Sequence, residues 1–156
     1  MPLPHPERLS DLIGSIYDCV LAREKWHATL TSVFQEIGCS NAVLTVHDLR
    51  TSALKLNLHV GIDREWIVQS PRYGAETLEI WGGPQRVASY PLEEPIVQSQ
   101  ATPRSSWMSN AWYREMAFPR GLHDCIGVCL VRDSRTVGAI AFGVHQDRGD
   151  VTDDTL

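Results

Sequence analysis

Two stretches of the chain combine histidine or cysteine with the alternating residue pattern of β-strands. If each stretch folds as a hairpin, alternation places one set of imidazoles and thiols on a single face of the sheet. This set comprises His47, His59, His123, Cys125, Cys129 and His145. Imidazole and thiolate are the usual ligands of zinc, copper and haem iron. A metal or haem sensor is therefore one candidate function. Against it stands the common use of cysteine as a small apolar residue.

Catalysis by a nucleophile would need a cysteine or serine within hydrogen-bond reach of a base. Cys125 and His123 lie two residues apart, on one face of the expected strand. The sequence contains no nucleophile elbow, no glycine-rich phosphate loop and no metalloprotease helix motif. We therefore predict that the chain is not an enzyme and carries no cofactor.

The two stretches that position these residues are predicted hairpins with unequal faces. The later hairpin covers 122–145 and turns at Asp133 to Arg135, and the earlier covers 41–60 and turns at Leu49 to Ser52. One face is aliphatic, through Leu44, Val46, Leu54, Leu56, Leu58, Ile126, Val128, Leu130, Ile140, Phe142 and Val144. The other is small or polar, through Thr45, His47, Asn57, His59, His123, Cys125, Gly127, Cys129, Ala139, Ala141, Gly143 and His145. We call this second face the thin face.

Helices are expected to cover both faces of this sheet. Apolar periodicity predicts two N-terminal helices within 6–37, and these should pack on the aliphatic face. Asp63 can cap a helix that runs to about Tyr73, although Pro71 should interrupt it.

A crossover spans 63–118 and is irregular over 82–104, with a short edge strand at 86–90 and a helix at 105–118. A segment this irregular is usually a lid or a binding loop. Residues 152–156 look like the start of a terminal helix. The whole chain is predicted to be one α+β domain with about five antiparallel strands.

Aromatic residues flank the irregular crossover and could enclose a pocket above the thin face. Small residues on a sheet leave volume that aromatic side chains can wall. The candidate ligand-binding residues are Trp66, Tyr73, Trp81, Trp107, Trp112, His123, Cys125, Cys129 and Ala141. If the tryptophans instead fill this volume, the domain would be a ligand-free dimerisation or interaction module.

The overall composition narrows the class of protein. The chain has 156 residues, 43% apolar and 21% charged, with a net charge of −5. It shows no signal-peptide pattern, no membrane-length apolar run and no basic stripe for nucleic acid. We therefore expect a cytoplasmic protein with no membrane partner. The four cysteines are scattered, which favours free thiols.

The order of elements resembles the PAS/GAF-like sensor fold. The chain is similar in particular to the N-terminal sensor domains of LuxR-type helix-turn-helix transcription regulators. The similar stretches are 12–26, 61–73, 109–142 and the terminal VTDDTL. The resemblance implies a sensor that binds a small apolar or aromatic ligand and controls a C-terminal DNA-binding domain that is absent from this chain. We also expect a homodimer, because homodimers are the commonest soluble oligomers and palindromic DNA sites favour them.

The best-known relatives bind acyl-homoserine lactones through a Trp, a following Tyr, an Asp-Pro pair and another Trp. Trp66, Tyr73 and Trp81 are the similar residues here. Glu79 and Ile80 stand where the Asp-Pro pair would fall, so the aspartate that would bind the ligand amide is replaced. We therefore expect a different ligand, whose identity the sequence leaves open.

Overall fold

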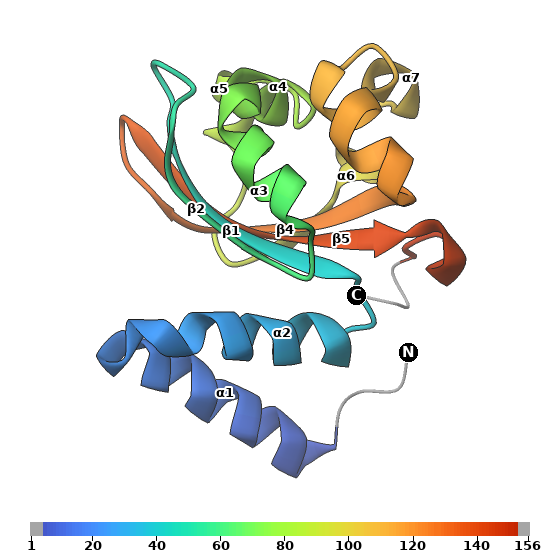
Figure 1. Ribbon diagram of the computed structural model, residues 1–156. Helices are drawn as coiled ribbons and strands as arrows, with labels where there is room; N and C mark the ends of the chain where they lie inside the picture. The colour runs from blue at the N-terminus through green and yellow to red at the C-terminus, as the bar shows by residue number, and fades with distance from the viewer. Residues whose placement is uncertain (1–4, 153–156) are drawn as a thin grey trace.

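The chain folds as an α+β protein in which a five-stranded antiparallel sheet separates two groups of helices (Figure 1). The computed structural model describes residues 5–152. Helices α1 (Pro6–Leu21) and α2 (Trp26–Glu36) lie on one face, and a short 3₁₀ turn at Arg23–Lys25 joins them. The crossover helices lie over the other face (Figure 1). The predicted fold class is confirmed.

The two predicted hairpins form one sheet, in which the first strand of the earlier hairpin pairs with the second strand of the later hairpin. Its order is β2–β1–β5–β4–β3. The strands are β1 (Asn41–Asp48), β2 (Leu54–Val60), β3 (Pro95–Val97), β4 (Leu122–Arg132) and β5 (Thr136–His145). Val43 of β1 lies opposite Ala141 of β5, which in turn lies opposite Gly127 of β4. Because of this register, the thin faces of the two hairpins form one continuous surface.

The crossover contains more short helices than the sequence indicated. They are α3 (Arg64–Gln69), η2 (Ser70–Tyr73), α4 (Gly74–Glu79), α5 (Pro84–Val87), α6 (Gln98–Ala101), α7 (Arg104–Trp107), the π-helix η3 (Tyr113–Ala117) and η4 (Phe118–Arg120). The Asp63 carboxylate caps α3 by accepting a hydrogen bond from Trp66 N, as predicted. The interruption expected at Pro71 is the 3₁₀ turn η2.

Three sequence predictions in the later chain need correction or lie beyond the described residues. The edge strand expected at 86–90 is wrong, because Pro84 starts helix α5 and the edge strand is β3, which pairs with β4 at 126–128. The helix expected at 105–118 is broken, because Asn110 Oδ1 accepts a hydrogen bond from Tyr113 N and so starts a new helical segment. The terminal helix expected at 152–156 lies outside the described residues, apart from Thr152.

The aliphatic face packs against α2 in the main apolar core. Phe34 of α2, Val60 of β2 and Phe142 of β5 belong to this core, and each is less than 10% exposed. Helix α1 packs on α2 and lies farther from the sheet (Figure 1). The prediction that both N-terminal helices cover the sheet therefore holds only for α2. As a result, one apolar side of α1 is exposed.

Three β-bulges interrupt the strand pairing, one of them between Cys129 and Val131, and the other two bring new side chains to the thin face. In the β4–β5 pairing, Leu122 lies opposite His145 and Asp124 opposite Val144, so His123 is an extra residue. In the β1–β2 pairing, His47 lies opposite Leu54, so Lys55 is the extra residue. A bulge shifts alternation by one position. Leu122 and Leu54 therefore face the thin side, and the sequence-based placement of His123 and Leu54 was wrong.

No helix within residues 5–152 is long and apolar enough to cross a membrane.

Candidate ligand-binding site

A cavity of about 150 Å³ lies between the thin face and the crossover helices. Its floor contains the small side chains of Thr45, Ala139 and Ala141, together with Gly127 and Gly143. The sequence produces this volume because alanine and glycine leave space above two adjacent central strands. A Cβ atom on Gly127 would lie 3.0 Å from the Trp81 ring, so this glycine allows the indole to approach the sheet.

Many of the predicted ligand-binding residues meet at this cavity. Those that line it are Trp66, Trp81, Trp112, Cys125, Cys129 and Ala141. Trp66 and Trp112 pack edge to face, with ring centroids 5.7 Å apart. Trp81 packs in the same way on Tyr90, which also lines the cavity. The tryptophans therefore wall the volume without filling it.

Tyr73, Trp107 and His123 do not line the cavity. Trp107 is 1% exposed, and its Nε1–H donates to Thr102 Oγ1 at 3.0 Å, so it supports the helices over the cavity. The buried Tyr73 donates its hydroxyl hydrogen to Glu115 at 2.5 Å. The bulge in β4 turns His123 toward Val144 O, 3.2 Å from its Nδ1. The side chains of these three residues thus form hydrogen bonds outside the cavity lining.

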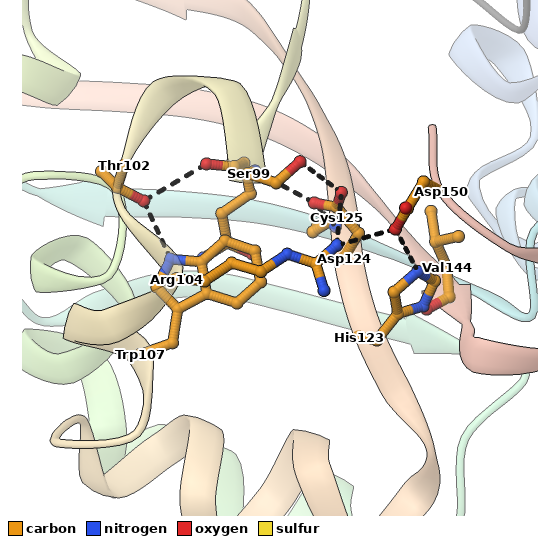
Figure 2. A network of polar contacts seen from close by, with 10 residues as sticks. Ser99, Thr102, Arg104, Trp107, His123, Asp124, Cys125, Val144 and Asp150 are labelled. Carbon is orange, nitrogen blue, oxygen red and sulfur yellow. Dashed lines mark hydrogen bonds and ion pairs between the residues drawn. The ribbon is translucent and has the colours of Figure 1, made fainter. Parts of the chain in front are cut away.

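Asp124 directly follows the bulge in β4, lines the cavity and bonds the crossover to the sheet (Figure 2). Its carboxylate accepts hydrogen bonds from Ser99 N at 3.1 Å, Ser99 Oγ at 2.6 Å and Cys125 N at 2.8 Å. Arg104 lies 3.8 Å from Asp124 and 3.1 Å from Asp150. This chain of contacts joins α6 and α7 to β4 and to the segment after β5.

A polar wall on β1, β2 and η2 was not singled out as a ligand site from the sequence. Asn57 Nδ2 donates to Ser70 Oγ at 2.7 Å, and Ser70 Oγ lies 3.1 Å from His59 Nε2. All three residues line the cavity, as do Asn41 and His47. Alternation had placed Asn57, His47 and His59 on this face. Ser70 and Asn41 could be assigned only from the fold.

Burial keeps the histidines and cysteines of the site uncharged at neutral pH. Loss of solvent lowers the pKa of His47 from 6.5 to about 4 and that of His59 from 6.5 to about 4. Burial also raises the pKa of the Cys125 and Cys129 thiols. Neutral thiols are weak nucleophiles and weak metal ligands.

The metal-binding face predicted from alternation does not form. Within residues 5–152, no group of three or more His, Cys, Asp or Glu side chains is placed to hold a metal ion. His123 turns away at the bulge, and His145 lies beside Asp147, 3.1 Å from its carboxylate and outside the cavity lining. Of the six His and Cys residues on which the metal hypothesis was based, His123 and His145 therefore lie outside the cavity, and the four that line it do not come together as a metal-binding group.

The position that would carry the ligand-binding aspartate of acyl-homoserine lactone receptors has no carboxylate in the cavity. Ile80 lines the cavity and is 3% exposed, whereas the Glu79 side chain is exposed to solvent. Among the described residues that line the cavity, Asp124 is the one acid, and there is no lysine or arginine. The site is therefore an apolar cavity with a polar wall of neutral groups.

The fold is similar to that of the ligand-binding domains of LuxR-family regulators. One similar solved structure is the N-acylhomoserine lactone dependent LuxR-family transcription factor CepR2 from Burkholderia cenocepacia, with a TM-score of 0.64 and 17% identity. The match covers 96% of this chain and 84% of that chain. Another is the ligand-binding domain of VqsR from Pseudomonas aeruginosa, with a TM-score of 0.58, 10% identity, and coverage of 88% and 78%.

At these identities the likeness establishes the fold, and the resemblance predicted from the sequence is confirmed at that level. No protein-family model and no curated protein matches the sequence.

Proposed function

We propose that this chain is the signal-sensing domain of a LuxR-type transcription regulator. It binds a small apolar or aromatic molecule in the cavity and controls an attached helix-turn-helix domain that binds DNA. The observation that carries the proposal is the cavity of about 150 Å³ between the thin face and the crossover, in a fold shared with LuxR-family ligand-binding domains. A cavity of this size suits a ligand of one or two rings.

The proposed output runs through the contacts of Asp124. Occupancy of the cavity would change the packing of Trp112, and with it the position of α6 and α7. Arg104 links α7 to Asp150, so a shift of α7 reaches the segment that leads toward the C-terminus. A ligand biases this equilibrium only if it binds one arrangement more tightly than the other.

Binding of indole tests the sensing proposal. Indole is a neutral aromatic molecule of a size that the cavity can hold. We expect it to raise the melting temperature of the chain in a concentration-dependent way, and to bind at one site by calorimetry. Ala141→Phe would fill the floor of the cavity and abolish this binding.

The matched control is Ala53→Phe, which adds the same side chain at an exposed position in the β1–β2 turn. This variant should bind indole as the unsubstituted chain does. Equal indole binding by both variants would show that the ligand lies elsewhere. Absence of binding to the unsubstituted chain would refute the sensing proposal.

A second candidate function is homodimerisation through α1. Leu9, Ile13, Tyr17 and Val20 lie on the side of α1 away from α2, and they are 48%, 47%, 72% and 75% exposed. An apolar stripe of this extent on a surface helix fits a protein interface. Tyr17→Glu together with Val20→Glu should convert a dimer to a monomer in analytical ultracentrifugation. A monomeric unsubstituted chain would exclude this function.

A further inference from the structure

The polar wall of the cavity contains buried atoms that have no hydrogen-bond partner. Of the residues that the structure describes, three have such an atom, namely Asn41 Oδ1, His47 Nδ1 and His59 Nδ1. The three residues are 3%, 7% and 6% exposed, and all line the cavity. A buried polar atom without a partner costs about 1–3 kcal/mol. Three of them in one cavity therefore indicate where a ligand would place polar groups.

Asn41 and His59 lie on adjacent strands at the same end of the cavity. His59 lies directly opposite Val43, and Asn41 is two residues from Val43 on β1. Diagonal neighbours of this kind have Cα atoms about 7–8 Å apart on one face of a sheet. The Asn41 amide lies over Gly143, where a Cβ atom would be only 1.9 Å from Oδ1. Gly143 thus leaves room for an amide that faces the cavity.

The serine contact favours one tautomer of the His59 ring. Ser70 Oγ accepts a hydrogen bond from Asn57, and its own hydrogen can go to either of two acceptors, of which the ring nitrogen is the nearer. His59 Nε2 lies at 3.1 Å and Ile67 O at 3.4 Å. With Nε2 as acceptor, the neutral ring carries its hydrogen on Nδ1. His59 then offers a donor and Asn41 an acceptor to the same part of the cavity.

We propose that the ligand is an uncharged molecule with a hydroxyl or amide group bound between Asn41 and His59, and with an apolar ring over the floor of the cavity. A hydroxyl or amide can donate and accept at once, so it satisfies both orphan atoms. No lysine or arginine among the described lining residues could pair with an anion. Asp124 already accepts three hydrogen bonds, from Ser99 N, Ser99 Oγ and Cys125 N, and lies 3.8 Å from Arg104, so its charge is paired within the protein.

His47 is the alternative anchor. It lies four residues beyond Val43 on β1, about 13 Å from the Asn41–His59 end at 3.3 Å per residue. A one-ring molecule cannot reach both ends. The orphan His47 Nδ1 therefore provides a competing site that the experiment must distinguish.

The test compares phenol, toluene and benzoate by calorimetry at pH 7.5. In an apolar cavity toluene binds more tightly than phenol, because the hydroxyl loses its hydrogen bonds to water. The proposal reverses this order: phenol should bind about tenfold more tightly than toluene, and benzoate more weakly than either. Asn41→Leu and His59→Phe should each remove the preference for phenol, while Ala53→Phe, at an exposed position outside the cavity, should leave it intact.

The outcomes separate this inference from the sensing proposal on which it rests. If indole binds but toluene equals or exceeds phenol, the sensing proposal stands and the polar anchor is refuted. If His47→Phe alone removes the phenol preference, the anchor lies at the other end and the inference is also refuted. If His59→Phe fails to fold, as its melting curve would show, Asn41→Leu still decides. Failure of every probe, indole included, refutes both.

Discussion

The two buried histidines should make the stability of the chain depend on pH between 5 and 7.5. Burial lowers the pKa of each ring from 6.5 to about 4. The unfolded chain therefore binds more protons than the folded chain between these two values. Stability is fully present above pH 6.5 and is lost as the pH falls toward 4.

The size of the loss follows from these values. From pH 7.5 to 5.0, each ring should cost about 2 kcal/mol of unfolding free energy, and the two together about 4 kcal/mol. The lowered pKa values of Asp48 and Asp63 act below pH 4 in the same direction, so they contribute little in this window.

Urea unfolding at pH 7.5 and 5.0 measures this loss in the unsubstituted chain and in the double variant His47→Gln, His59→Gln. The double variant should be less stable at pH 7.5 but should lose about 4 kcal/mol less on acidification. If both proteins lose the same free energy, the two rings are not buried as neutral groups and the reasoning fails.

Three further substitutions test the surroundings of the cavity. Asp124→Ala should lower the unfolding free energy by about 3 kcal/mol in urea, because Ser99 loses its buried acceptor; a loss below about 0.5 kcal/mol would contradict this. Trp107→Phe removes one indole hydrogen bond and should cost about 1 kcal/mol without changing indole affinity, since Trp107 does not line the cavity. Gly143→Ala should displace the Asn41 amide and remove the phenol preference in calorimetry, and an intact preference would count against the Asn41 contact.

Residue periodicity was sufficient to predict the layers of the fold. The aliphatic face of each hairpin and the apolar stripe of α2 are matching surfaces, and the structure packs them together. The small residues of the thin face, among them Ala139, Ala141 and Gly127, likewise predicted an open volume, and the cavity lies above them.

Register could not be predicted in the same way. A bulge inserts one residue without any strong local signal, and the one at His123 turned a predicted cavity residue away and brought Leu122 to the cavity. The helices of the crossover could not be predicted from the sequence either, because they are three to six residues long and too short for a periodic pattern. Ser70 reaches His59 only through the fold of this segment.

The most direct test of the account is a crystal structure of the chain grown with 4-bromophenol, recorded at the bromine absorption edge. The account predicts one anomalous peak inside the cavity, over Ala141 and beside Trp112, with the hydroxyl between Asn41 and His59. No anomalous density there, with side chains closing the volume between the thin face and the crossover, would contradict the claim that this domain binds a small molecule.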